Sequence, residues 1–439
     1  MIYLAFIFLA IAAIVAVSSN PDMLSPAKLL LVTFAMFHAG ALYTELPVLA
    51  GGMIFLVLAV CFVVTFAEGQ MVQGLPPMRK RWRLPDPRQA PDFATAIWLF
   101  SAPSLIAQLF MIQQFGGLSG YIDSLGTRVV DWAGFGWART LINLMTPLNL
   151  IYFALGLQTR RDRRWWTIYG LHFLILLMLG VLSGSRSSLL TVFAIQLMLF
   201  HYLRTPVKGR IAAVLAGTLI LSAFTLGVLR NGVSIGDEGI EFGTFEQQST
   251  ASLGSFNAGV QALKVITEAP FMPLAHGSTF VSVLTNAVPR AVWPDKPDPG
   301  GVFFTKHYTG DAWYGFSNLA PTFLGEFLIN FGWAWGVAGF ALVYPLILLA
   351  VVRFYRSQRI ALQQVLTPAM AIDVVLFLTI TWSMVGLMVG ETTNVVVNLV
   401  FSQVIPILFV RFYVRRVSSH RASRWRAAAP ATAPRAASA

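Results

Sequence analysis

Residues 48–67 read VLAGGMIFLVLAVCFVVTFA, an uninterrupted apolar run without a charged side chain. A helix of this length crosses the roughly 30 Å of hydrocarbon in a lipid bilayer. Comparable runs occur near residues 2–18, 27–43, 93–115, 138–157, 165–182, 187–203, 211–229, 333–352, 368–389 and 394–412. We therefore predict an all-α polytopic membrane protein with about eleven transmembrane helices, or twelve if the stretch 317–332 adds a half-span or a re-entrant helix.

The composition of the whole chain supports this class. Of its 439 residues, 56% are hydrophobic and only 11% are charged, and the mean hydropathy is +0.68. A soluble domain of this length needs far more charge to cover its surface. The net charge of +12 lies in short clusters between the apolar runs, which indicates membrane topology rather than nucleic-acid binding. A single cysteine, Cys61, leaves no internal disulfide and no thiolate metal site.

The positions of the basic residues predict the orientation. Most of the 31 lysines and arginines lie in alternate connections, at 79–88, 160–164, 204–210, 353–359 and 411–435. Basic connections stay in the cytoplasm, so the N-terminus is expected outside and the C-terminus inside. The first run lacks the basic start of a secretory signal and is expected to remain as the first helix. Residues 1–412 then form the transmembrane domain, with the outer loop 230–316 inserted, and 413–439 form a disordered basic tail in the cytoplasm.

The outer loop 230–316 is far longer than a plain connector, and long ordered loops tend to carry function. Within it, Leu253, Phe256, Val260, Leu263 and Ile266 recur at helical spacing. A second apolar stretch covers 277–294 and contains two prolines near its end. We predict that both stretches form short amphipathic helices at the membrane surface.

The end of the loop, WPDKPDPGGVFFTKHYTGDAWYGFSN at 293–318, mixes aromatic rings with polar and cationic side chains. Aromatic faces with polar neighbours suit sugar rings, which present apolar C–H faces and hydroxyl edges. The candidate sugar contacts are Trp293, Phe303, Phe304, Tyr308, Trp313 and Tyr314, close in sequence to Lys296, Lys306 and His307. An aromatic belt at the membrane interface is the alternative for any one of these rings, but it explains their clustering with cations less well.

Three arginines fall on the predicted outer side: Arg186 in LSGSRSSLL, Arg230 at the end of the eighth run, and Arg290 in VPRAVWPDKP. Arginine matches phosphate with two parallel hydrogen bonds. Together the three side chains are candidates for a clamp on a lipid-linked diphosphate, whose negative charge increases as it leaves. For Arg186 the alternative is a snorkelling side chain that caps the sixth span.

Two carboxylates are also placed outside, Glu326 in LGEFLINFGW and Glu391 in VGETTN. Either is suited to accept a proton from an attacking sugar hydroxyl as a general base. The alternatives are a surface position at the interface for Glu326 and, for Glu391, a contact with the N-terminus of the last span. Asp373 and His172 lie inside predicted spans, where packing roles are expected. The histidine spacing predicts no metal site, and no nucleotide-binding glycine motif is present.

Three segments carry a family resemblance: SGSRSSLL at 183–190, GSTFVSVLTNAVPRAVWPDKPDPG at 277–300 and LGEFLINFGWAWGVAGF at 324–340. With them the chain resembles the Wzy-type O-antigen and exopolysaccharide polymerases, which join oligosaccharide repeat units at the bacterial inner membrane. The most specific part is the PR-x-x-WP-x-KP core, formed by Pro289, Arg290, Trp293, Pro294, Lys296 and Pro297.

The resemblance implies a glycosyltransferase-C-like fold in the inner membrane, with the outer loop in the periplasm. It implies a metal-independent, cofactor-free transfer of the growing glycan from undecaprenyl diphosphate to a new lipid-linked repeat unit, with no part for nucleic acid. A chain-length regulator and a flippase are the implied protein partners. Arg186, Arg230, Arg290 and Lys296 would hold the donor, with Trp293, Lys306, Tyr308 and Trp313 as further substrate contacts. Glu326 would be the base, and His307 is the second choice.

Two other functions stay open at this point. An O-antigen ligase shares the general architecture but transfers the finished glycan to lipid A core; the PR-x-x-WP-x-KP core favours the polymerase. A non-enzymatic flippase or exporter of lipid-linked sugars usually shows internal repeats and polar groups near the membrane midplane. The sequence shows neither feature.

Overall fold

The computed structural model describes residues 2–42, 44–78, 92–125, 131–132, 134–183, 186–231, 233–236, 239–242, 257–269, 272–286, 288, 290, 292–309 and 319–428. Its helices and strands are α1 (Ile2–Ser19), α2 (Pro26–His38), η1 (Ala39–Leu42), α3 (Val48–Val72), α4 (Ala94–Gln114), α5 (Leu118–Asp123), α7 (Gly136–Asn143), α8 (Met145–Gln158), α9 (Arg163–Leu182), α10 (Arg186–Leu203), α11 (Gly209–Asn231), β1 (Val233–Gly236), β2 (Gly239–Phe242), α13 (Ala258–Glu268), α14 (Ser278–Thr285), α15 (Gly300–Tyr308), α16 (Thr322–Ala361), α17 (Pro368–Gly386), α18 (Thr392–Val397), η3 (Asn398–Val404) and α19 (Ile405–Ala428).

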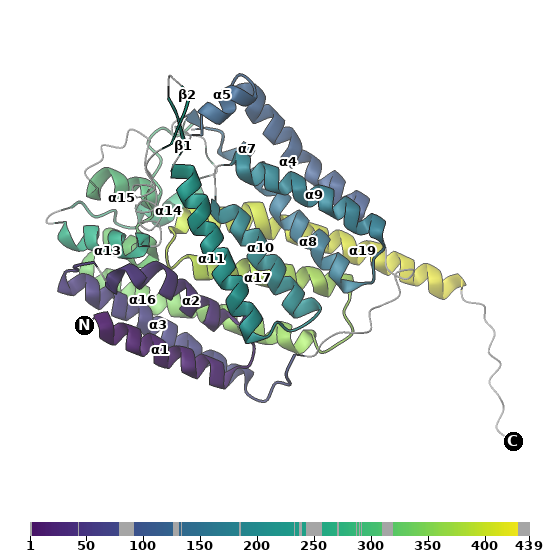
Figure 1. Ribbon diagram of the computed structural model, residues 1–439, viewed down its shortest axis with the longest axis horizontal. Coiled ribbons are helices and arrows are strands. Elements are labelled where there is room, and N and C mark those ends of the chain that lie inside the picture. The colour runs from purple at the N-terminus through teal and green to yellow at the C-terminus, as the bar shows by residue number, and fades with distance from the viewer. Residues whose placement is uncertain are drawn as a thin grey trace.

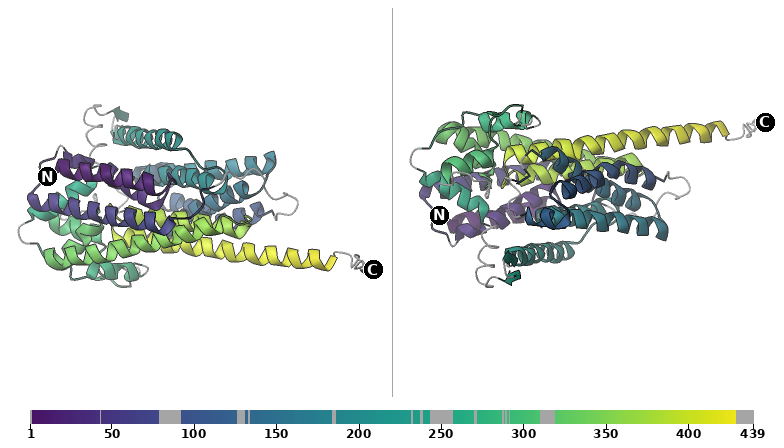
Figure 2. Two further views of the ribbon diagram at one scale, coloured as in Figure 1. Left: turned by 90° about the horizontal axis from the view of Figure 1, so that it is seen from below. Right: turned by 90° about the horizontal axis from the view of Figure 1, so that it is seen from above.

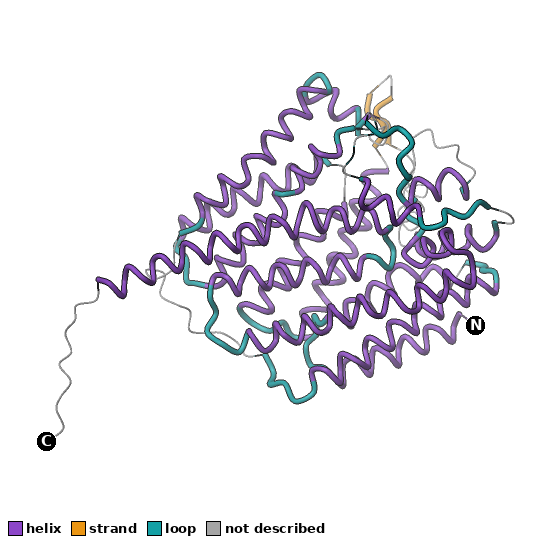
Figure 3. Tube along the Cα trace, turned by 180° about the vertical axis from the view of Figure 1, so that it is seen from behind, coloured by secondary structure: helices purple, strands orange, loops and turns teal. Residues whose placement is uncertain are grey.

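The long helices run side by side along the longest axis of the molecule (Figures 1 and 2). The N-terminus and the short helices α13, α14 and α15 lie at one end, which we call the loop end. Helix α19 leaves the bundle at the opposite end, the tail end. Helix α1 therefore begins, and helix α19 ends, at opposite ends of the molecule. The helical architecture dominates the trace (Figure 3), and the one described hairpin pairs β1 with β2 antiparallel.

Every apolar run predicted to cross the membrane is helical in the structure. Within the described residues, seven helices are long and apolar enough to cross a bilayer, and the first, second, seventh and eighth predicted runs appear as shorter apolar helices. An all-α membrane protein is thus confirmed. The number of crossings and the cytoplasmic side remain predictions.

Two hydrophobic cores lie side by side in the bundle. One is built mainly from α8, α9, α10 and α17. The other joins α1, α2, α3 and α16 to the loop helices α13 and α15. The second core therefore fixes the loop end to the membrane-spanning helices.

Helix α16 is two helices joined at Gly332, whose backbone (φ 69°, ψ −171°) is not helical. In a straight helix Phe323 and Tyr344 would lie about 30 Å apart, but their ring centroids are 5.4 Å apart. A Cβ atom on Gly336 would lie 2.7 Å from the carbonyl oxygen of Phe327. The segment 322–331, which we call the half-helix, therefore folds back along 333–361. A half-span or re-entrant helix was expected at 317–332, and the helical hairpin agrees with that expectation.

Two expectations about the loop and the tail differ from the structure. Helix α13 buries Val260, Leu263 and Ile266 as the spacing predicts, but this face packs against α2, α3 and α16 rather than against lipid. Helix α19 continues to Ala428, well beyond residue 413 where disorder was predicted. Its alanines and arginines are good helix formers, and the preceding helix supplies the nucleus.

The polar residues inside the predicted spans have partners. His172 is fully buried, and its two ring nitrogens lie 2.9 Å from Ser101 Oγ and from Asn149 Nδ2. Asp373 forms an ion pair with Arg411 on α19. These contacts join neighbouring helices and agree with the packing roles expected for both residues.

Candidate functional site

The buried carboxylate of Glu326 is the centre of a polar cluster at the loop end. Glu326 lies on the half-helix and is 0% exposed. Its Oε1 accepts a hydrogen bond from Thr279 Oγ1 at 2.9 Å, and its Oε2 accepts two from Thr392, from N and Oγ1, both at 2.7 Å. Glu326 thus joins the half-helix to α14 and to the start of α18. A surface position at the interface is wrong for this residue.

Asn330 completes the connection between the half-helix and α14. Its Nδ2 donates to Thr279 Oγ1 and to the carbonyl oxygen of Glu326, both at 2.7 Å. Its Oδ1 accepts from the backbone N–H of Gly277 at 2.8 Å. Because Thr279 donates to Glu326 and accepts from Asn330, one hydroxyl group bridges the two side chains.

The chain before α14 also caps the half-helix. The backbone N–H groups of Ala275 and His276 donate to the carbonyl oxygens of Ile329 and Asn330, at 2.8 and 3.1 Å. The last carbonyls of a helix lack intrahelical partners. The outer loop supplies these partners and fixes the half-helix in place.

Glu391 is the second buried carboxylate of the site. It is the N-cap residue of α18 but makes no side-chain capping bond there. Instead its Oε2 accepts a hydrogen bond from the backbone N–H of Gly301, at the start of α15. Burial raises the pKa of Glu391 to about 7; the Gly301 N–H lowers it, the negative charge of Glu326 raises it and Asn394 lowers it. The contact expected with the last span is thus made with the N-terminus of α15.

Two adjacent glycines bring α15 against both carboxylates. A Cβ atom on Gly300 would lie 2.9 Å from Cδ and Oε1 of Glu326. Any side chain at position 300 would therefore collide with that carboxylate, while Gly301 binds Glu391. We call Glu326 and Glu391 the carboxylate pair.

Helix α14 presents a polar face to this site and an apolar face to the outside. Ser282 Oγ and Thr393 Oγ1 lie 2.5 Å apart and join α14 to α18. On the other face Val281 is 48% exposed and Leu284 is 82% exposed. The helix is amphipathic, as its sequence predicts, with its polar side turned toward the carboxylate pair.

A cluster of cations surrounds Asp298, two residues before Gly300. Arg290 Nη2 lies 2.5 Å from Asp298 Oδ1, and Lys306 Nζ lies 2.7 Å from Oδ2. Arg290 Nη1 also donates to the carbonyl oxygen of Pro294 at 2.9 Å. These bonds hold the guanidinium at the surface, where 48% of the side chain remains exposed.

Lys296 belongs to the same cluster. Its Nζ donates to the carbonyl oxygen of Val288 at 2.7 Å, and burial followed by the charge of Arg290 lowers its pKa. Arg290, Lys296 and Lys306 form what we call the cation cluster. Three cations against Asp295 and Asp298 in the same segment leave a net positive charge, which suits an anionic ligand.

The cation cluster and the carboxylate pair meet at the start of α15. Asp298 contacts the cations, whereas Gly300 and Gly301 contact the carboxylates. Three residues of fully extended chain span at most about 11 Å. One short backbone segment therefore contacts both the cation cluster and the carboxylate pair.

The remaining predicted residues on α15 and before it lie nearby. His307 is exposed, with its ring centroid 4.5 Å from that of Phe303. Trp293 is 43% exposed. Tyr308 donates through its hydroxyl to the carbonyl oxygen of Pro273 at 3.4 Å. In the described part of the chain no hydrogen bond joins these three side chains to the carboxylate pair.

Four candidate site residues are not placed by side chain. Arg186 is the first residue of α10 and Arg230 lies near the end of α11, but their side chains are outside the described set. Trp313 and Tyr314 fall in 310–318, also outside it. The clamp of three arginines therefore stays a prediction, with only Arg290 located.

Sequence reasoning missed the residues that assemble the site. They are uncharged residues and one of two aspartates in a basic segment: Thr279, Asp298, Gly301, Asn330 and Thr392. Polar residues in the otherwise apolar stretches 277–288 and 324–340 are the one signal that marks some of them. An isolated Thr or Asn in such a stretch is too common to identify a partner.

A second polar cluster lies at the tail end. Asp22, between α1 and α2, accepts hydrogen bonds from His201 Nε2 at 2.9 Å and from the Tyr355 hydroxyl at 2.6 Å, and Arg359 lies 3.6 Å away. Burial alone would raise the pKa of Asp22, but these donors and the Leu24 N–H hold it at about 2. The cluster joins the α1–α2 turn to α10 and α16, and sequence analysis did not predict it.

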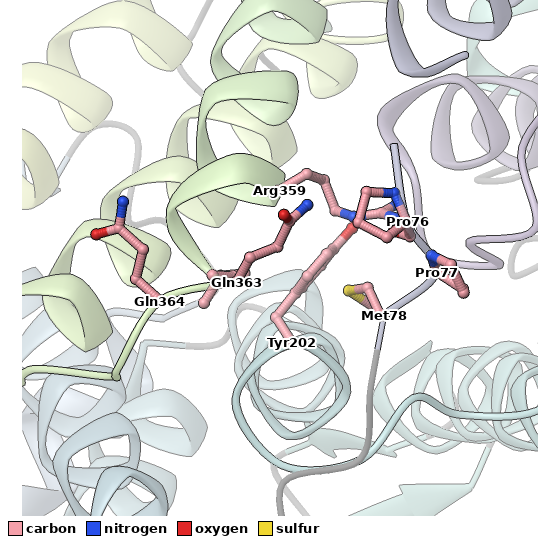
Figure 4. Close-up of a pocket in the computed structure, with 8 residues that line it drawn as sticks. Pro76, Pro77, Met78, Tyr202, Arg359, Gln363 and Gln364 are labelled. Atoms are coloured by element: carbon pink, nitrogen blue, oxygen red, sulfur yellow. Dashed lines mark hydrogen bonds between the residues drawn. The ribbon is translucent and has the colours of Figure 1, made fainter. Parts of the chain in front are cut away.

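A pocket of about 430 Å³ opens beside this cluster (Figure 4). It is lined by Pro76, Pro77, Met78, Tyr202, Arg359, Leu362, Gln363 and Gln364. Arg359 donates to the Tyr355 hydroxyl at 2.8 Å and to the Pro76 carbonyl oxygen at 3.0 Å. Its charge therefore stabilises the packing of α16 at this end, opposite the outer loop.

Comparison of the chain with protein-family models, with curated proteins and with solved structures finds no match in any of the three. The structure therefore shows the class of the protein, a helical membrane protein with a polar site at the loop end. Its activity is argued below from the site.

Proposed function

We propose that the protein is a membrane glycosyltransferase that polymerises oligosaccharide repeat units carried on undecaprenyl diphosphate, at the periplasmic face of a bacterial inner membrane. The observation that carries the proposal is the juxtaposition of the cation cluster with the carboxylate pair at the start of α15. Glycosyl transfer from a lipid diphosphate needs both: cations for the leaving diphosphate and a group that accepts the proton of the acceptor hydroxyl.

The surface next to the cation cluster suits a donor with a lipid tail. Leu284 and Val292 are 82% and 75% exposed, and they flank Arg290 in sequence. Apolar side chains beside exposed cations match a ligand with a hydrocarbon chain and an anionic headgroup. The partly exposed Trp293 is available to stack on a sugar ring.

The proposal follows from chemistry at the loop end, and the resemblance around 277–300 and 324–340 supports it. Both motifs fall in the site: the first contains α14, Arg290 and Lys296, and the second contains most of the half-helix. A ligase remains the main rival, because the same two requirements apply to transfer onto lipid A core.

The test uses the purified protein in nanodiscs with lipid-linked repeat units from its host. A ladder of lipid-linked glycans, formed without nucleotide or added metal, is expected. Folded protein that gives no ladder, but that transfers glycan when lipid A core is added, would replace the polymerase by the ligase. Transfer in neither assay would reject the proposal.

A further inference from the structure

The two members of the carboxylate pair differ in how their oxygens are used. Glu326 accepts three hydrogen bonds from Thr279 and Thr392, which occupy both of its oxygens, and it is 0% exposed. A carboxylate has about four acceptor positions. Glu326 is therefore nearly saturated by protein donors and has little capacity left for an acceptor hydroxyl.

The two carboxylate oxygens of Glu391 differ in their contacts with the protein. Its Oε2 accepts from the Gly301 N–H, whereas its buried Oε1 meets no described donor in hydrogen-bonding geometry; the Asn394 side chain lies close enough to lower the pKa of Glu391. The side chain is 2% exposed, yet the burial is shallow: Gly390 and Thr392 on either side are partly exposed and Asn394 is exposed. A buried polar atom without a partner is costly, and a ligand hydroxyl would satisfy it.

The charged surroundings of Glu391 are simple. Of the elements packed around it, α14, α18, η3 and the last turn of α17 carry no charged side chain, and the half-helix carries only Glu326. On α15 the charged residue Lys306 and the titratable His307 lie in the last turn, away from Gly301. Burial and the charge of Glu326 together raise the pKa of Glu391 to about 7, against the opposing effect of the Gly301 N–H.

We infer that Glu391 is the catalytic base of the proposed transfer and that Glu326 is its positioning residue. The inference rests on the proposed function. Glu326 fixes Thr392 and the start of α18 and packs against Gly300, so it sets both the backbone that carries Glu391 and the N–H group that orients it. A group that titrates near neutral pH is well matched to acid–base work in a cell.

The step balances as follows. The acceptor hydroxyl gives its proton to Glu391 Oε1, and its oxygen forms a bond to the anomeric carbon of the donor. The bond between that carbon and the diphosphate oxygen breaks, and the electron pair leaves with the lipid diphosphate. The cation cluster stabilises this charge, and Glu391 later returns its proton to water.

The first test compares E391Q with E268Q in the nanodisc assay. Glu268 is an exposed glutamate on α13 in the same outer loop, so E268Q is a matched control. We expect E391Q to lower the polymerisation rate by roughly 10²–10⁴-fold and E268Q to leave it unchanged. In the wild type the rate should rise with pH through about 7, because the base acts in its ionised form. A ladder at the wild-type rate from E391Q would overturn the inference but leave the proposed function standing.

The second test separates positioning from catalysis. Removing the charge of Glu326 in E326Q should move the midpoint of the pH–rate profile to lower pH, because that charge raises the pKa of Glu391. If E391Q does not fold, this variant decides: an unmoved midpoint overturns the inference. Infrared difference spectra should also show a carboxyl band that titrates near pH 7 in the wild type and in E268Q, and moves in E326Q. Wild-type protein that shows this band but makes no polymer would reject the proposed function together with the base role.

Discussion

Thr279 offers the sharpest test of how the site is held together. Its hydroxyl donates to Glu326 and accepts from Asn330, and all three side chains are fully buried. Replacing it with valine keeps the shape but removes both bonds. A hydrogen bond to a charged group contributes about 1.5–3 kcal/mol, and an orphaned buried donor costs about 1–3 kcal/mol. Allowing for non-additivity and for the buried methyl group, we expect T279V to lower the free energy of unfolding by about 2–5 kcal/mol.

The chain provides its own reporter for this measurement. Cys61 is the single cysteine of the sequence, is fully buried in α3, and belongs to the same hydrophobic core as the half-helix. A thiol-reactive fluorogenic dye therefore reports unfolding of that core during a denaturant titration in detergent. The control is T285V on the same helix, where the hydroxyl makes only a 3.5 Å contact with the Ser282 carbonyl oxygen.

We expect T285V to change the free energy of unfolding by no more than about 0.5 kcal/mol. If T279V also stays within that range, the bridge between Glu326 and Asn330 does not contribute as the geometry requires. The role given to Thr279 in holding Glu326 would then be rejected.

Three further outcomes follow from single residues. G332A should lower the free energy of unfolding by about 1–3 kcal/mol because only glycine adopts this backbone conformation without strain. The control G52A on α3, where an added Cβ meets open space, should not lower it. Equal melting curves for the two variants would contradict the hairpin geometry. R290A should lower polymer yield by roughly 10- to 100-fold because it removes one cation from the leaving diphosphate. Protein abundance should stay unchanged because the side chain is 48% exposed. Full-length polymer at normal yield would remove Arg290 from the site. For Asp22 the folded-state pKa of about 2 lies below the ordinary 3.8. Its ionisation therefore stabilises the fold above pH 4 by about 2 kcal/mol, and this contribution is lost as the pH falls toward 2. The difference in the free energy of unfolding between wild type and D22N should shrink over that window, and a constant difference would refute the coupling.

The positions of the candidate site residues were only partly predictable. Arg290, Lys296 and Lys306 stand out in sequence because cations are rare in a chain with 11% charged residues, and the structure brings them together. Their shared partner Asp298 was overlooked because an acid in a basic segment looks like a surface residue. The sequence also did not distinguish the roles of Glu326 and Glu391 within the carboxylate pair. That distinction depends on which carboxylate oxygens accept hydrogen bonds and not on the residue type.

The apolar runs along the chain predict the class of the protein and the places of its helices. Both follow from the length of apolar runs and the spacing of their breaks, which are properties of neighbouring residues along one chain. The stretch 317–332 was likewise expected to add a half-span or a re-entrant helix. That Thr279, Gly301, Glu326 and Glu391 form one site depends on how the helices pack in three dimensions. These residues come from α14, α15, the half-helix and the turn before α18, and a hydrogen bond between them depends on distances of about 3 Å that no local pattern encodes.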